Sequence, residues 1–328
     1  MGRKLLGTWM AVLALGGLVA CDGGGTADGG TDSGPAVDSG PQRVCPRTNV
    51  PAPEELMGAC CFRHSNEDQL ATPELRLAYL QITEPAGSTL TSTTLTGVLN
   101  TAMQRETFNW LVRAEGSEGD GAATLVTGFG RRLEDGTYAF SAGAAGTEGD
   151  PDTWCPVTLE GNVSGENLTT SALEGSVTVP IFDEDGENVQ LELTLREVEI
   201  TSAMLSEGRS CVGVKVARPF TYTPAGTLQG FIEVAGAIGG EISVPGINTT
   251  VCTAIAGDVL TDADYCETTP QGEWATPPDS ICDATGCTQN TAGTTDACDP
   301  ASSCNAWRIV ADFAASGVDI TNSACAAP

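Results

Sequence analysis

The sequence predicts a mainly β protein: a disulfide-stapled antiparallel β-sandwich of roughly eight to ten strands, with one or two short helices. Three observations lead to this class. Short segments in which apolar and polar residues alternate recur along the chain, and turns rich in glycine and aspartate separate them. The chain begins with an apolar segment typical of exported proteins. It also contains 13 cysteines, which form disulfides in an oxidising compartment.

The expected strands follow from this alternation. From Val189 to Leu195 every second residue is valine or leucine and the residues between them are polar, which is the pattern of a half-buried strand. The apolar phase then shifts, which predicts a β-bulge near Arg196–Glu197. Leu133–Gly136 has the composition of a hairpin turn. The strands expected in this way are Leu75–Thr83, Phe108–Val112, Thr124–Phe129, Thr137–Ala142, Val177–Ile181, Val189–Leu195 and Trp307–Phe313.

Helical spacing is found in fewer places. It is clearest for five apolar residues that recur three or four positions apart, namely Leu95, Val98, Leu99, Ala102 and Met103. Ser92 or Thr93 precedes them as an N-cap. A second short helix is expected over Ile247–Ile255, ending at Gly257. The stretch Gly226–Gly240 fits a helix by its apolar spacing, but its five glycines argue against one.

The N-terminal residues predict export. Arg3 and Lys4 precede an apolar run, Leu5–Leu18, that is too short to span a bilayer but has the length of a signal-peptide core. The run ends in Leu18-Val19-Ala20-Cys21, which resembles the lipobox of bacterial lipoproteins. The resemblance implies that residues 1–20 are removed and that Cys21 becomes an acylated, membrane-anchored N-terminus. The alternative is an ordinary secretory signal, and both place the chain outside the cytoplasm.

The segment after Cys21 predicts a tether. Residues 21–44 are rich in glycine, aspartate and serine, and they lack the apolar side chains needed to offset the entropy of ordering. Residues 45–328 are expected to form a single β-rich domain with a cysteine-rich C-terminal part, 252–325. Within that part, Tyr265–Asn305 has few apolar residues and is expected to be an irregular, bridged loop region.

Charge limits the partners. The formal net charge is −28, and loss of Arg3 and Lys4 with the signal peptide lowers it by two, to −30. Nucleic acid and anionic surfaces would be repelled, so no nucleic-acid partner is expected. The expected partners are the membrane, bound through the lipid anchor, and a protein or glycan at the cell surface. The anchor is expected in the outer membrane rather than the inner membrane.

Of the 13 cysteines, Cys21 is the predicted site of lipid attachment, which leaves twelve. An even number of cysteines in an exported chain predicts disulfides rather than zinc ligands. These twelve contain no C-x-x-C pair, and His64 is the only histidine, so the spacing of a zinc site is missing. The twelve candidates for disulfide bonding are Cys45, Cys60, Cys61, Cys155, Cys211, Cys252, Cys266, Cys282, Cys287, Cys298, Cys304 and Cys325.

No catalytic residue, cofactor or metal site is predicted. Nucleophilic catalysis by a serine or cysteine usually needs a base, and His64 is the only histidine available. The G-x-S-x-G motif of serine hydrolases does not occur. A pair of carboxylates can still hydrolyse a glycosidic bond, so a secreted glycosidase-like hydrolase stays an alternative. So does a calcium-dependent adhesion module, because Asp183–Asn188 places side-chain oxygens around a glycine and Asp258, Asp262 and Asp264 form a second acidic cluster. We interpret both loops as solvated turns.

The layout as a whole resembles uncharacterised envelope lipoproteins of the myxobacterial kind. The resemblance rests on the acidic Gly/Asp tether, the helix followed by Phe108-Asn109-Trp110-Leu111, and the late cysteine-rich region. It implies an envelope setting and brings no catalytic residues. The sequence therefore predicts a lipid-anchored envelope protein with a structural or binding role.

The lipid anchor is testable through Cys21. Replacing Cys21 by Ser removes the sulfur that carries the diacylglyceryl group, so we expect the variant to stay uncleaved or to appear in the soluble fraction. Metabolic labelling with a radioactive fatty acid, followed by membrane fractionation, measures both effects. A variant that remains processed and membrane-bound like the original protein would contradict the anchor.

Overall fold

The computed structural model describes residues 72–321, with gaps at 118, 141–154, 183–188, 207, 217–220, 245–246, 258–262 and 291–297. All of the described residues belong to one compact unit, Pro41–Pro328. Several predicted features lie outside the described residues: the signal peptide, the tether with Cys21, the cysteines Cys45, Cys60, Cys61 and Cys325, His64, the loop Asp183–Asn188, Asp258 and Asp262.

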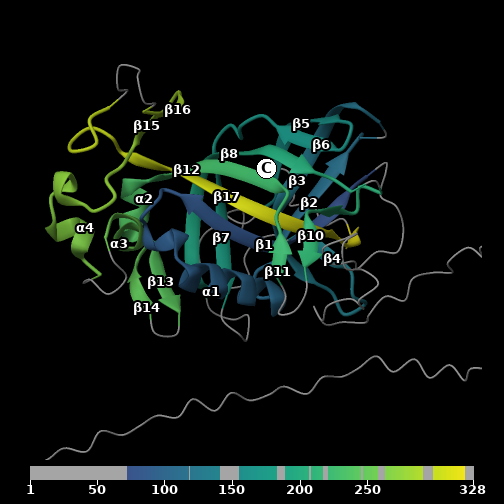
Figure 1. Ribbon diagram of the computed structural model, residues 1–328, viewed down its shortest axis with the longest axis horizontal. Coiled ribbons are helices and arrows are strands. Elements are labelled where there is room, and N and C mark those ends of the chain that lie inside the picture. Colours follow the sequence, from purple (N-terminus) through teal and green to yellow (C-terminus); the bar gives the residue numbers. More distant parts are fainter. Residues whose placement is uncertain are drawn as a thin grey trace, which may run out of the picture. The chain divides into compact units, whose positions relative to one another are not determined.

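Antiparallel strands dominate the described part, which confirms the mainly β class. Eight of them pair in chain order, and the last pairs with the first, so that the sheet closes on itself. The two layers expected of a sandwich are thus joined by hydrogen bonds on both sides (Figure 1). The eight strands are β1 (Glu74–Glu84), β2 (Trp110–Glu115), β3 (Gly121–Arg132), β5 (Val157–Ser164), β6 (Asn167–Thr170), β8 (Val189–Met204), β12 (Gly226–Glu233) and β17 (Ala306–Gly317).

The long strand β8 organises one side of the closed sheet. Its C-terminal end pairs with β6, and its N-terminal half pairs with β7 (Ser176–Phe182) along the same edge. Its other edge pairs with β12 and, at Leu191, with β13 (Glu241–Val244). The predicted bulge is confirmed: Glu197 has a positive φ of 49°, and the register against β12 shifts beside it.

Bulges keep apolar side chains directed into the closed sheet. In β1 the register shifts after Leu77, so that Leu77 and then Leu80 and Ile82 line the interior. In β8 the bulge shifts the alternation by one residue, so that Leu195 and then Val198 face the interior. Without these shifts, alternate residues of each long strand would pass to the outer face partway along.

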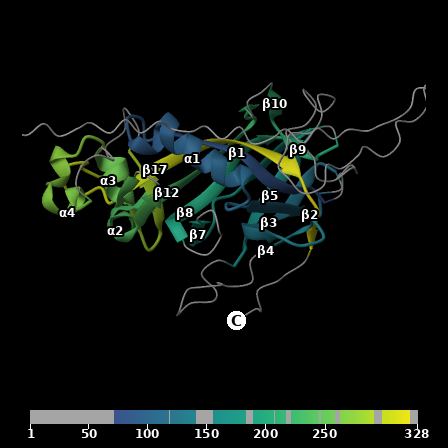
Figure 2. The same cartoon turned by 90° about the horizontal axis from the view of Figure 1, so that it is seen from below.

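Helix α1 (Thr93–Gln104) lies at the lower end of the closed sheet in Figure 1, and Figure 2 shows it from below, beside β1. It is the helix that the sequence predicts. Ser92 is its N-cap and accepts a hydrogen bond from the Leu95 amide at 3.2 Å. A short 3₁₀ turn, η2 (Thr89–Thr91), leads into it. None of the helices in the described ranges has the length and hydropathy needed to cross a membrane.

Smaller elements cover parts of the outer surface. Next to β3, the strand β4 (Tyr138–Phe140) and its parallel partner β18 (Ile320–Thr321) enclose a small apolar cluster around Leu111. On another side lie β9 (Cys211–Val212), β10 (Val214–Val216) and β11 (Thr221–Thr223). Between β12 and β17 the chain also forms α2 (Val234–Gly239), β14 (Ile247–Thr250), α3 (Val251–Ala256), α4 (Tyr265–Thr268), η3 (Gln271–Glu273), β15 (Ser280–Asp283) and β16 (Gly286–Gln289).

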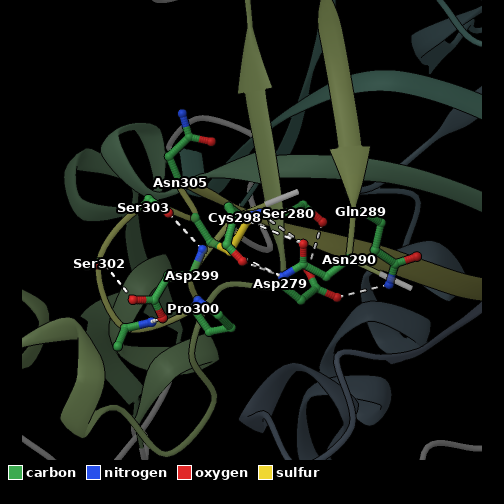
Figure 3. The surroundings of a disulfide bond; sticks show 12 residues. Asp279, Ser280, Gln289, Asn290, Cys298, Asp299, Pro300, Ser302, Ser303 and Asn305 are labelled. Carbon is green, nitrogen blue, oxygen red and sulfur yellow. Dashed lines mark hydrogen bonds between the residues drawn. A yellow bond between two sulfur atoms is a disulfide. The ribbon is translucent and has the colours of Figure 1, made fainter. Parts of the chain in front are cut away.

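Three disulfides hold this region. They join Cys252 to Cys266, Cys282 to Cys287, and Cys298 to Cys304. Around the last bridge, Asn290 accepts from the Cys298 amide at 3.1 Å and donates to the Cys298 carbonyl at 2.9 Å (Figure 3). These bonds indicate an oxidising compartment, as an exported chain requires. Cys155 and Cys211 are disulfide-bonded as well.

Three sequence predictions need correction here. Gly226–Gly240 is neither all helix nor irregular: β12 occupies its first half and α2 its second. The helix expected over Ile247–Ile255 begins only at Val251, because β14 takes up the preceding residues, and it ends at Gly257 as predicted. Tyr265–Asn305 is less irregular than expected, since β15 and β16 form a hairpin within it.

The pairing of six late cysteines generates a prediction about the seventh. Among the seven cysteines after Gly226, only Cys325 is left over from the three bridges, so if all twelve cysteines are paired within one chain, Cys325 bonds an earlier cysteine. Cys211 is our candidate, because it lies opposite Ser316 near the end of β17, nine residues before Cys325. Non-reducing peptide mapping should recover one disulfide-linked peptide pair that joins a cysteine before Gly226, expected to be Cys211, to Cys325. A free thiol on Cys325 would contradict this.

Candidate binding site

An apolar cavity lies inside the closed sheet. Its volume is about 80 Å³. We call it the inner cavity, and fifteen residues from the strands, η2 and the start of β2 line it: Leu77, Leu80, Ile82, Leu90, Phe108, Trp110, Val177, Val179, Leu193, Leu195, Val198, Leu228, Ile232, Ile309 and Ala311. Closed sheets of eight strands have interiors that are either filled by side chains or hold one small ligand.

The walls of the inner cavity contain almost no polar chemistry. Every lining side chain is apolar, and the one polar atom among them, Trp110 Nε1, donates to Thr127 Oγ1 at 2.8 Å. Thr127 Oγ1 in turn donates to the Leu111 carbonyl at 2.9 Å. None of the fifteen lining side chains titrates in the physiological range or can act as a nucleophile. The inner cavity is therefore suited to holding an apolar group and not to transforming one.

A groove lies next to the inner cavity, between α1 and the end of the β7–β8 hairpin. Its volume is about 470 Å³. We call it the α1 groove; apolar residues and a polar rim line it, namely Thr94, Gly97, Val98, Thr101, Ala102, Arg105, Thr107, Ile181, Phe182 and Gln190. Five of these positions recur at helical spacing along one side of α1, so the helix forms one wall and the hairpin forms the other.

Buried polar contacts fix the C-terminal end of α1, and with it the groove. Arg76 on β1 is only 2% exposed, and its guanidinium donates to the Met103 carbonyl of α1 and to Asn109 Oδ1, the latter at 2.7 Å. Just beyond the helix, Glu106 accepts from Tyr138 Oη at 2.9 Å and pairs with Arg132 at 3.1 Å. Burial, together with the Glu106 carboxylate, raises the pKa of Tyr138 to about 12, so the phenol stays protonated and keeps donating.

A third hollow, the acidic pocket, lies on the outer side of β8 beside α2 and β13. It measures about 410 Å³ and is lined by Val189, Glu192, Thr194, Gly236, Gly239, Gly240 and Glu241. Leu191 pairs with Ile242, so the next antiparallel position places Glu192 opposite Glu241. Directly opposed residues have Cβ atoms about 4.5–5.5 Å apart. This brings together two carboxylates, as the hydrolase alternative requires.

The structure describes some of the site residues predicted from the sequence and not others. Six of the seven cysteines after Gly226 are paired with one another, all but Cys325, which lies outside the described residues, and Cys155 and Cys211 are bonded too. Of the two acidic loops, the described part contains only Asp264, which precedes α4. Within the described ranges, no group of three or more His, Cys, Asp or Glu side chains is arranged to hold a metal ion.

Sequence reasoning missed three of the residues that shape these hollows. Glu192 was recognised only as an outward-facing strand residue, and Glu241 was not singled out because its strand lies in the ambiguous region after Gly240. Gly97 lies within the predicted helix but has no side chain that could contribute to the apolar spacing. The position of Gly97 between Thr94 and Thr101 on one helix face was the available signal.

Comparison with known proteins identifies no relative: no family model, no curated protein and no solved structure matches the chain.

Proposed function

We propose that the chain is a lipid-anchored, extracytoplasmic binding protein that holds a small apolar group inside its closed sheet. The observation that carries this proposal is the inner cavity, whose fifteen lining side chains are all apolar. Binding rather than catalysis is favoured because these walls offer neither an acid nor a base to a bound molecule. The lipobox-like segment Leu18–Cys21 supports the anchor, and the disulfides support an oxidising setting.

The binding surface is internal, which agrees with the character of the outside. Among the described residues, the only large hydrophobic side chain that is strongly exposed is Met204, at 47%. An apolar partner therefore finds few contacts on the outer surface, whereas the inner cavity offers them from several strands at once. The acidic exterior keeps the anchored domain in solution beside the membrane.

Trp110 provides a direct test, because its ring lines the inner cavity. The full chain with Cys21 replaced by Ser keeps covalently attached acyl groups out of the assay. Titration with bromoethane, which is small enough for a cavity of about 80 Å³, should quench part of the tryptophan fluorescence saturably, since bromine quenches an indole that it touches. The same ligand should raise the melting temperature by a few degrees. Trp110→Phe should remove the saturable quenching and keep the thermal shift.

Filling the inner cavity provides the control. Ala311→Leu adds three carbons at the wall and should abolish the quenching while the melting temperature of the unliganded protein holds or rises. If this variant is destabilised by overpacking, Val179→Ile adds a single methylene from β7, another wall of the cavity, and should also weaken binding. Saturable quenching that survives both substitutions would contradict an internal site.

A second candidate function is favoured by the acidic pocket. Glu192 on β8 and Glu241 on β13 both line this pocket, and a pair of carboxylates is the catalytic equipment of most glycosidases. The pocket ranks below the inner cavity because none of its lining residues is aromatic, and three are glycines, so a sugar ring finds no platform on which to stack.

A chromogenic glycoside panel tests this second candidate. If it holds, Glu192→Gln and Glu241→Gln should each reduce hydrolysis at least about a hundredfold, because each removes a group needed for acid, base or nucleophilic action. Glu199→Gln, on the same strand but outside the pocket, is the matched control. Equal activity in the three variants would exclude the pocket as the site of hydrolysis.

A further inference from the structure

The α1 groove and the inner cavity follow one another along the same face of β7. Val177 and Val179 line the inner cavity, and Ile181, two residues further on, lines the groove. The other wall has the same continuity: Phe108 lines the cavity, and its amide donates at 3.2 Å to the carbonyl of Ala102, which lines the groove. A molecule that extends from the cavity past Ile181 into the groove would contact both.

Gly97 is the residue that leaves the groove open. Glycine inside a helix destabilises it relative to alanine, so its presence in the middle of α1 calls for a reason. Packing within the protein does not supply one, because a Cβ built at Gly97 meets nothing within 4 Å. Its φ is not in the positive range either. Among the described residues, a wider groove is the one visible effect of the missing side chain.

The groove differs from the inner cavity in its polarity. Its floor is apolar, with Val98, Ile181 and Phe182, and hydroxyl and amide groups stand at its rim. Arg105 is the one cationic side chain among its lining residues, in a chain with a large negative net charge. It directly follows the C-terminus of α1. A guanidinium at this place offers charge-assisted hydrogen bonds to a carboxylate or similar anion.

We propose that the two spaces form one site for a single-chain amphiphile with an anionic head, of the fatty-acid class. The end of the chain occupies the inner cavity, the rest of it lies on the floor of the α1 groove, and the head is held at Arg105. This inference rests on the proposed function, since the inner cavity receives the chain end. It adds the ligand class and a second binding element that the apolar cavity alone does not specify.

The test compares an amphiphile with a purely apolar ligand in the same Cys21→Ser background. Decanoate binding is measured by calorimetry and bromoethane binding by tryptophan quenching. A Cβ at Gly97 meets no protein atom within 4 Å, and Gly97→Leu adds its bulk on the groove side of α1, so it should weaken decanoate at least about tenfold and leave bromoethane unchanged. Gly97→Ala is the matched control: it should stabilise α1 and keep decanoate affinity within about twofold.

The head group is tested at Arg105. Arg105→Gln should weaken decanoate about tenfold and leave decan-1-ol unaffected, and Arg105→Lys should restore most of the loss. If bromoethane binds but Gly97→Leu leaves decanoate unchanged, the groove assignment is wrong and the proposed function stands. If Arg105→Gln weakens acid and alcohol equally, the anionic head is wrong. If neither decanoate nor bromoethane binds the parent chain, the proposed function itself fails.

Discussion

The pairing of β12 with both β8 and β17 is the contact on which the rest of the structure depends. It closes the sheet, so that none of the eight strands of the ring is left as a free edge on which other chains could add. The close approach needs glycine at one point. A Cβ at Gly226 would overlap the ring of Phe313 on the neighbouring strand. With this position open, β12 pairs along its full length with β17.

Closure also couples regions that are distant in sequence. The first described strand, β1, pairs with β17 from Leu75 opposite Gly317 to Glu84 opposite Val310. On the outer face a polar ladder crosses the closing strands: Arg308 on β17 bonds Glu84 at 2.5 Å and Gln229 on β12 at 2.6 Å. The bulge in β8 extends this coupling to the cysteine-rich region, because Glu197 accepts from the Cys287 amide at 2.9 Å. The strands before β12 and those after it therefore cannot unfold without opening the ring.

Local patterns predicted the elements, and long-range pairing decided how they combine. The spacing of Leu95 and Leu99 and the cap at Ser92 sufficed for α1, and the alternation from Val189 sufficed for β8 and its bulge. Strands β5 and β6 were missed because their sequences carry few apolar residues and their burial comes from neighbours. Closure itself leaves no local signal. It depends on registers between segments far apart in the chain, and the glycines of β12, which make those registers possible, read locally as evidence against any element.

The candidate site shows the same division, and its energetics suggest why it persists. Its apolar residues were predicted to face a core, but a cavity is a difference between the space inside the ring and the volume of those side chains, which no local pattern reports. An unfilled volume of 80 Å³ costs about 2 kcal/mol at roughly 24 cal/mol per Å³. Gly97 adds about 1 kcal/mol relative to alanine. The two costs arise in neighbouring parts of the structure. Ala311→Leu would remove the first and Gly97→Ala the second. Together they are a sizeable share of the stability of an ordinary domain. A ligand bound across both spaces would offset them by contacts that the empty protein cannot make.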